Sequence, residues 1–366
     1  MLRKGRKVMG FILSIIVSCI AIGAIVLVIL SPGKMVPFTD EKGQVIANSL
    51  SEKVFTEING RQMGMIIKSK DISLPVLLFI HGGPGMPEYF LTQDYPTNLE
   101  DYFTVVWWDQ RGAGLSFDSD IDKAEMNVTQ FVEDTIGVTN YLRERFKQDK
   151  IYLLAHSWGT FIGIQAAYRA PQLYAAYMAV AQITDQEESE RLAYVYMKDY
   201  YAKQGNTKMV AKLKKWDYLS EGYGKMRDSA MHQAGIGTMH EMKSVVKDIF
   251  MRSLGCKEYT VGEKINLWRG KIFSSKTGLS QEAHTTDLRR YITRLEVPTY
   301  FFSGGYDYTV NYMRARDYLR DLAAPVKGFY LFKHSAHSPI FEEAEAFDKI
   351  IATDVLQGNN SLSVEK

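Results

Sequence analysis

The feature that most constrains the fold is a series of short, continuous apolar runs, each followed by a Gly-rich or polar segment. The runs cover residues 76–80, 103–108, 151–155, 177–181, 297–302 and 328–332. Continuous rather than alternating apolar character is typical of strands buried on both faces of a parallel sheet. Helical patterns lie between them at 129–147, 160–170 and 311–322. The alternation predicts a doubly wound, mostly parallel α/β sheet, whose active site lies at the carboxyl ends of the strands.

A hairpin, a helical interval and a polar tail accompany this core. Residues 54–59 and 61–68 are strand-like and flank Asn59-Gly60, the strongest short-range signal for a hairpin. The interval 182–296 lacks proline and has the pattern of amphipathic helices punctuated by Gly. We expect it to form a helical cap over a core of residues 35–181 and 297–356; an independent helical domain without substrate contact is the alternative. The polar residues 357–366 predict a flexible tail.

The first thirty residues combine a basic cluster with a long apolar run. The cluster consists of Arg3, Lys4, Arg6 and Lys7. The run from Val8 to Leu30 reaches roughly 34 Å as a helix, enough to cross a hydrocarbon core of about 30 Å. It predicts a single-pass anchor within residues 1–34. The positive-inside rule leaves the basic stub in the cytoplasm and the catalytic part outside, so that the protein sits in the cell membrane.

A cleaved signal peptide and a lipoprotein signal are the alternatives to an anchor. The apolar region of a signal peptide usually has about 7–15 residues and ends at a small-residue cleavage site. Here the run is longer and ends in Leu30-Ser31-Pro32. The residues Ile16-Val17-Ser18-Cys19 are similar to a lipobox, but the chain stays apolar beyond Cys19 up to Leu30.

Charge and cysteine content exclude other classes of protein. Forty-four Lys and Arg against 42 Asp and Glu give a net charge of +2, which argues against nucleic-acid binding driven by bulk charge. Cys19 and Cys256 cannot supply a disulfide framework and lack zinc-site spacing. With Cys19 in the bilayer they cannot pair with each other. A folded enzyme or binding protein remains.

The main chemical motif is Ala155-His156-Ser157-Trp158-Gly159, between an apolar run and a helical pattern. It matches the nucleophile elbow G-x-S-x-G, with Ala in place of the first Gly. The sharp turn needs small residues on both sides of the serine and exposes its hydroxyl at the edge of the sheet. His156 points elsewhere on such a turn, so we interpret it as structural.

A nucleophilic serine needs a base, and the base needs an orienting acid, which in this topology follow in the order Ser, acid, His. Asp307 stands at the tip of the Gly-rich turn after the run 297–302, and His334 and His337 follow the last run. We expect His337 to be the base, since its longer loop lets the ring reach back to Ser157, and Asp307 to orient it. A solvated turn residue is the alternative for Asp307.

The tetrahedral intermediate requires two hydrogen-bond donors for its oxyanion. The backbone N–H of Trp158, directly after the nucleophile, is one candidate. The segment His81-Gly82-Gly83-Pro84-Gly85 brings backbone close to a ligand without side-chain obstruction, so Gly83 is assigned as the second donor. A phosphate-binding loop is the alternative, but the P-loop lysine is missing.

These motifs, with residues 108–116 (WDQRGAGLS) and His337-Ser338-Pro339, resemble the α/β-hydrolase superfamily and within it the proline iminopeptidase family of serine aminopeptidases. The resemblance covers residues 54–347 and is weakest in the cap. It implies a triad at Ser157, Asp307 and His337 and an oxyanion hole at Gly83 and Trp158. Asp109 and Arg111 would brace the loops around the site. An epoxide hydrolase is disfavoured because Asp109 does not stand at the elbow.

The family also implies cap carboxylates, often beside a tryptophan, that hold the free amine of the substrate. Here Trp216 precedes Asp217 and Trp268 precedes Arg269, and a further acidic cluster lies at 185–190. Glu187 and Glu188 in that cluster are candidates, against the alternative of helix-dipole complementation.

We therefore expect a membrane-anchored serine aminopeptidase that acts on short peptides and needs no metal or organic cofactor. An esterase or amidase for small acyl substrates is the second hypothesis, and a catalytically silent binding protein is the third.

Overall fold

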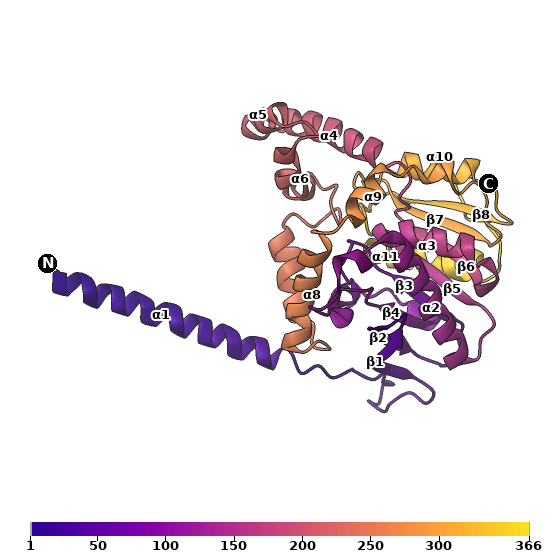
Figure 1. Cartoon of the computed structure of the whole chain (residues 1–366), viewed down its shortest axis with the longest axis horizontal. Coiled ribbons are helices and arrows are strands. Elements are labelled where there is room, and N and C mark those ends of the chain that lie inside the picture. The colour runs from indigo at the N-terminus through magenta and orange to yellow at the C-terminus, as the bar shows by residue number, and fades with distance from the viewer. Residues whose placement is uncertain (1, 366) are drawn as a thin grey trace.

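The computed structural model of the chain describes residues 2–365; Met1 and Lys366 lie outside it, as do the side chains of the expected basic cluster. Eight strands form one sheet in the order β1-β2-β4-β3-β5-β6-β7-β8 (Figure 1). The strands are β1 Leu50–Ile58, β2 Arg61–Ser69, β3 Val76–Ile80, β4 Thr104–Trp108, β5 Ile151–His156, β6 Tyr174–Val180, β7 Thr299–Gly304 and β8 Lys327–Phe332. Each predicted apolar run lies in a strand, within a few residues of the expected bounds.

The sheet is mostly parallel, as predicted. Strands β3 to β8 pair in parallel, while β1 pairs antiparallel with β2 and β2 antiparallel with β4. The predicted hairpin is confirmed, with Ile58 opposite Arg61. Asn59 and Gly60 have φ values of 48° and 74° in its turn, which Asn and Gly adopt more readily than other residues.

Helices cover both faces of the sheet, so that the central strands β3, β4 and β7 are buried on two sides, whereas the edge strand β1 is largely half-buried. Leu78 and Ile80 pack into a core with α2, α3 and α10, whereas Leu77 and Phe79 point to the opposite core, against α12 and part of the cap. The helices of the α/β core are α2 Val128–Phe146, α3 Trp158–Arg169, α10 Tyr312–Asp321, α11 Pro339–Glu342 and α12 Ala344–Ile350. Short 3₁₀ or π turns occupy Tyr89–Gln93, Leu99–Asp101, Gly114–Ser116, Lys123–Glu125, Pro171–Leu173, Val246–Phe250, Leu288–Arg290 and Ile351–Val355.

The chain between β6 and β7 folds into helices that stand to one side of the sheet (Figure 1). They are α4 Gln186–Lys203, α5 Thr207–Lys215, α6 Glu221–Gln233, α7 Met251–Gly255, α8 Val261–Ser274 and α9 Leu279–Thr285. Helices α4 to α6 share a small core of their own around Met197, Leu213 and Tyr223. The amphipathic patterns therefore bury their apolar faces within the cap as well as on the sheet.

The N-terminal helix α1 (Leu2–Ile29) extends away from the core (Figure 1). Its segment Phe11–Ile29 has a mean hydropathy of 3.1, and none of it is buried. By length and composition this helix can cross a membrane, although a signal sequence has the same properties. Cys19 on this helix and the buried Cys256 are both free, as expected.

The end of α1 is attached to the cap helix α8. The ammonium of Lys264 donates hydrogen bonds to Leu30 O and Ser31 Oγ, each at 2.8 Å. Pro32 forms an isolated bridge with Thr260, at the start of α8. A cation at the carboxyl end of a helix is favourable because the last carbonyls lack partners there.

The prediction of a loose tail is wrong for residues 359–365. Val364 N–H donates to Phe329 O at 2.9 Å, on the open edge of β8. The buried carboxylate of Asp354 accepts hydrogen bonds from Ser361 N–H at 3.0 Å and Leu362 N–H at 2.8 Å. The polar tail is held in place because its N–H groups donate hydrogen bonds to the edge strand β8 and to a buried carboxylate. Its composition did not reveal this role.

Candidate active site

Ser157 stands at the turn between β5 and α3, as the elbow motif predicts. Its φ of 53° and ψ of −122° are strained for a residue with a side chain. Its N–H donates to Val180 O at 2.9 Å, which holds the turn against β6. A Cβ on Gly159 would lie 2.2 Å from Ile80 O, so only glycine fits there.

The alanine that replaces the first glycine of the motif is accommodated by a second glycine on α3. Ala155 is fully buried, and a Cβ on Gly163 would lie 3.0 Å from its methyl group. The extra methyl on β5 therefore occupies space that a side chain at residue 163 would otherwise need.

The acid and the base expected from the sequence are in contact. His337 Nδ1 lies 2.9 Å from Asp307 Oδ2. Asp307 is fully buried after β7, and its other oxygen accepts the Val310 N–H at 2.9 Å. Ser157 and His337 line the same cavity. His334 is exposed on the same loop and lines neither of the cavities beside Ser157.

Glu342 fixes the loop that carries His337. One oxygen accepts the Ala336 N–H at 2.9 Å and the other accepts the His240 N–H at 2.6 Å, so this one carboxylate joins the loop to the cap. Burial raises the pKa of Glu342 to about 7. Sequence analysis missed this residue, because its only signal is its position five residues after His337.

His156 links the serine turn to the base loop. Its Nδ1 lies 2.6 Å from Glu88 Oε1, and its Nε2 lies 2.9 Å from the backbone oxygen of His337. Burial alone would lower the pKa of His156, but the Glu88 carboxylate outweighs it and raises the pKa. Because both partners are acceptors, an imidazolium satisfies them together. These contacts are those of a structural residue, as expected.

The loop 81–85 passes directly over Ser157. A methyl group on Gly82 would lie 3.1 Å from Ser157 Cβ, and Gly83, with φ of 122°, lines the same cavity as the serine. Neither the N–H of Gly83 nor that of Trp158 donates a hydrogen bond to a residue within 2–365. Free, rigid N–H groups beside the nucleophile are what an oxyanion hole requires.

Gln110 connects this loop to the elbow and was not singled out from the sequence. Its Oε1 accepts the indole N–H of Trp158 at 3.0 Å, and its Nε2 donates to His81 O at 2.6 Å. Its backbone N–H donates to His81 Nε2 at 3.1 Å. Burial lowers the pKa of His81 to about 4, so the ring stays neutral and accepts this bond. The DQRG motif containing Gln110 was the available signal.

Asp109 and Arg111 brace the surrounding loops. Asp109 Oδ2 accepts the Leu115 N–H at 2.7 Å, and burial raises the pKa of Asp109 to about 8. The buried Arg111 binds Asp134 at 2.7 Å and Glu125 at 2.8 Å, which joins the loop to α2. Neither residue lines the cavities beside Ser157.

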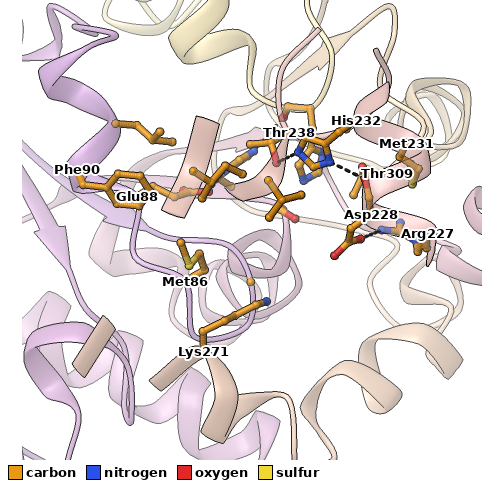
Figure 2. A pocket seen from close by; sticks show the side chains of 18 of the residues that line it. Met86, Glu88, Phe90, Arg227, Asp228, Met231, His232, Thr238, Lys271 and Thr309 are labelled. Carbon is orange, nitrogen blue, oxygen red and sulfur yellow. Dashed lines mark hydrogen bonds and ion pairs between the residues drawn. The ribbon is translucent and has the colours of Figure 1, made fainter. Parts of the chain in front are cut away.

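Two cavities, of about 230 and 340 Å³, meet at Ser157 and share Gly83, Arg227 and Thr309. The first is the one drawn in Figure 2, and helices α6 and α8 of the cap supply much of its wall. Its charged lining residues are Glu88, Arg227, Asp228 and Lys271. The second contains Glu190, which accepts hydrogen bonds from Arg227 Nε. The cap residues thus lie beside Ser157, which argues against an independent helical domain.

Among the cap acids considered from the sequence, Glu190 of the cluster 185–190 lines the second cavity, whereas Glu187, Glu188 and Asp217 line neither cavity. Glu187 is exposed, and Glu188 forms an ion pair with Arg191 at 2.7 Å on the outer side of α4. Asp217 instead accepts the Leu219 N–H within its own turn. Trp268 does line the first cavity, whereas its neighbour Arg269 lies over the ring of Phe117. Glu187 and Glu188 lie in the first turn of α4 and line neither cavity, which favours helix-dipole complementation over amine binding.

Sheet order, elbow and motifs together define the class. The chain belongs to the alpha/beta hydrolase family, whose family model, described as alpha/beta hydrolase fold, matches residues 75–212. A curated relative, the probable aminopeptidase YbaC of Bacillus subtilis (strain 168), is 31% identical over 302 residues, which cover 79% of this chain and 91% of the relative.

Solved structures share the fold at lower identity. The proline iminopeptidase of Mycobacterium smegmatis has a TM-score of 0.58 at 15% identity, and the match covers 84% of this chain and 98% of that one. A proline iminopeptidase-related protein of Thermus thermophilus gives 0.57 at 19% identity, over 83% and 98%. A Vigna radiata epoxide hydrolase mutant gives 0.52 at 18% identity, over 84% and 99%. These structures therefore define the fold and leave the reaction open.

Proposed function

We propose that this protein is a serine hydrolase in which Ser157 is the nucleophile, His337 the general base and Asp307 the orienting acid. The observation that carries the proposal is the 2.9 Å contact between His337 Nδ1 and Asp307 Oδ2 at the cavity that also contains Ser157. With Nδ1 donating to Asp307, the Nε2 of His337 is free to accept the serine proton.

In the proposed reaction Ser157 Oγ attacks the carbonyl carbon as its proton passes to His337. The oxyanion that forms is stabilised by the N–H groups of Gly83 and Trp158. Collapse expels the leaving amine or alcohol, which takes the proton from His337. Water then attacks the acyl-enzyme with His337 again as base, and Ser157 is regenerated.

We infer that the substrates are short peptides with a free N-terminus. The name of the curated relative supports an aminopeptidase, and the restricted cavities under the cap support short substrates. Asp228, an exposed cap carboxylate in the first cavity, is the candidate partner for an ammonium group through Oδ2, since Oδ1 accepts a hydrogen bond from Arg227 Nη1 at 2.9 Å. An esterase or amidase is the second candidate, since the same machinery cleaves simple esters. An epoxide hydrolase is disfavoured because serine occupies the elbow.

The test combines active-site labelling with a substrate panel. We expect a fluorophosphonate probe to label the wild type but not Ser157→Ala, and His337→Gln to lower kcat by about 10⁴-fold. His334→Gln, on the same loop, is the matched control and should retain full activity. Aminoacyl anilides should be cleaved and their N-acetyl forms should not. Fast ester cleavage without turnover of any free-amine substrate would contradict the aminopeptidase assignment and support the esterase assignment.

We also propose that α1 anchors the protein in a membrane with the catalytic part outside the cytoplasm. The apolar length of Phe11–Ile29 and its full exposure support a span. The anchored chain should resist alkaline carbonate extraction and keep its N-terminus. Loss of the first thirty residues would indicate a signal peptide, and a lipid on Cys19 that Cys19→Ser abolishes would indicate a lipoprotein.

A further inference from the structure

The first cavity beside Ser157 contains one cation that no carboxylate of the protein neutralises. Lys271, on α8, points its side chain into this cavity beside Met86 (Figure 2). Its ammonium forms no hydrogen bond or ion pair with any residue between 2 and 365. It is the cap residue three positions after Trp268, on the same lining face of the helix.

The carboxylates around the two cavities already have other partners. Glu190 binds Arg227 through Nε at 2.7 Å, and Asp228 binds Arg227 Nη1 at 2.9 Å. Glu88 Oε1 lies 2.6 Å from His156 Nδ1. Each of these carboxylates therefore has a basic side chain within hydrogen-bond distance, whereas the ammonium of Lys271 has no such partner among residues 2–365.

An unpaired ammonium is costly where water is restricted. Burial lowers the pKa of Lys271, although Asp228 acts in the opposite direction. An anion that entered this cavity would relieve the cost and gain a charge-assisted hydrogen bond. Met86, Ile249 and Trp268 give this cavity an apolar share of wall, and the ammonium of Lys271 is a polar feature that a ligand lying against it can bind.

We propose that Lys271 binds a carboxylate of the substrate and thereby selects short, carboxylate-bearing substrates. This proposal rests on the proposed hydrolase function and adds a specificity residue to it. In a peptide the carboxylate has two possible sources, the C-terminus of a dipeptide or tripeptide and the side chain of an acidic residue. A longer peptide would place its C-terminus beyond Lys271 and lose the contact.

The first experiment compares peptide pairs on the full-length wild type and Lys271→Met. The first pair compares a dipeptide that has a free C-terminus with the same dipeptide amidated at its C-terminus. The second pair compares a neutral dipeptide amide with a dipeptide amide whose first residue is acidic. We expect Lys271→Met to lower kcat/KM about tenfold or more for the carboxylate form, through KM, and to leave the amide form unchanged. The pair that shows the difference identifies the source of the carboxylate.

Lys276→Met is the matched control, because Lys276 is exposed just beyond the end of α8. This variant should leave the ratio of kcat/KM between the carboxylate and the amide substrates as in the wild type. Lys271→Arg keeps the charge and should retain the preference, which separates recognition from damage to the cap. Equal losses for carboxylate and amide substrates in Lys271→Met would overturn the proposal.

A second measurement separates this proposal from the aminopeptidase assignment. Nitrophenyl hemisuccinate and nitrophenyl butyrate differ in one carboxylate and need no free amine. If no peptide is cleaved but Lys271→Met loses activity on the hemisuccinate alone, the aminopeptidase assignment is contradicted and the proposed role of Lys271 is supported. If peptides are cleaved and the variant treats every charged and neutral pair alike, the role of Lys271 fails instead.

Discussion

Asp109 is a buried acid whose protonation state contributes to the stability of the site. Its raised pKa of about 8 means that the carboxyl is mostly protonated at neutral pH, and it still accepts the Leu115 N–H. The unfolded chain ionises this group near pH 3.9. Its contribution to stability is therefore complete below about pH 4 and is lost as the pH rises toward 8.

Asp109→Asn should remove this pH dependence, because the amide has a similar shape and does not titrate. We expect the difference in the free energy of unfolding, variant minus wild type, to rise by about 1.4 kcal/mol per pH unit between pH 5 and 7. Urea denaturation at three pH values measures this, with the exposed Asp149→Asn as control. Parallel pH profiles of Asp109→Asn and wild type would contradict the assignment.

Gly159 shows how one missing methyl group sets the position of the nucleophile. A Cβ there would lie 2.2 Å from Ile80 O, which is a backbone atom and cannot move aside. Gly159→Ala should lower the free energy of unfolding by about 1–3 kcal/mol and displace Ser157, with loss of probe labelling. Gly224→Ala is the control: nothing lies within 4 Å of its Cβ on α6, so it should stabilise the protein slightly.

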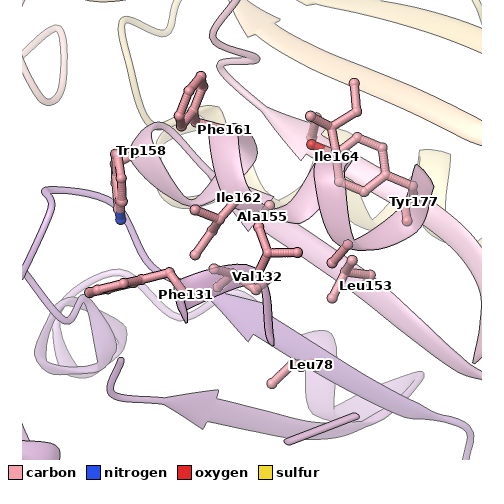
Figure 3. Packing of buried hydrophobic residues seen from close by; sticks show 14 of the residues in the cluster. Leu78, Phe131, Val132, Leu153, Ala155, Trp158, Phe161, Ile162, Ile164 and Tyr177 are labelled. Atoms are coloured by element: carbon pink, nitrogen blue, oxygen red, sulfur yellow. The ribbon is translucent and has the colours of Figure 1, made fainter. Parts of the chain in front are cut away.

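At the scale of elements, the packing of α3 on β5 determines where Ser157 stands. Figure 3 shows Ala155 of β5 beside Ile162 of α3, with Phe131 and Val132 of α2 packed below them. Because α3 begins directly after the serine, any shift of this helix moves the nucleophile. The Ala155–Gly163 contact is the point at which this chain departs from the usual elbow.

This contact predicts a compensating pair of substitutions. Gly163→Ala alone should destabilise the protein by about 1–3 kcal/mol, since the new Cβ meets the methyl of Ala155. Adding Ala155→Gly should restore part of the loss, and a double-mutant cycle measures the coupling. Full recovery is not expected, because the new Cβ also lies 3.3 Å from Tyr177. Strict additivity of the two substitutions would exclude the contact as the cause.

At the scale of the whole molecule, the carboxyl end of α1 and the C-terminal tail are both attached to the rest of the protein. Lys264 ties the end of α1 to α8, the helix that carries Trp268 and Lys271 at the first cavity. The tail closes over β8, the last strand before His337. The proposed membrane anchor and the active-site cavity are therefore connected through one helix.

Truncation after residue 358 should destabilise the protein, because the Asp354 carboxylate would lose the donors Ser361 and Leu362. We expect a loss of about 1–3 kcal/mol in the free energy of unfolding. Ser361→Ala should lose a smaller part of it, and the exposed Ser275→Ala should change stability by less than about 0.5 kcal/mol. A truncated chain as stable as the full one would show that the tail contacts are dispensable.

The sequence by itself determined the sheet and the elements around it. Continuous apolar runs report burial on two faces, and the elbow, the turn with Asp307 and the loop with His337 each follow such a run. Local pattern suffices here because parallel strands bring their carboxyl ends to one edge. The contact of His337 with Asp307 follows from that rule.

Only the tertiary structure decided which charges reach the cavity. Glu187, Glu188 and Asp217 have the right chemistry but line neither cavity, the first two lying on α4 and Asp217 in the turn between α5 and α6. Asp228 and Lys271 line the first cavity from helices with no motif. The roles of Glu88 and Glu342 could likewise not be predicted, because each contacts residues distant in the chain, and for Gln110 the DQRG motif marked the position but not its partners. Side-chain direction in the cap depends on packing between helices, and no short segment of sequence encodes it.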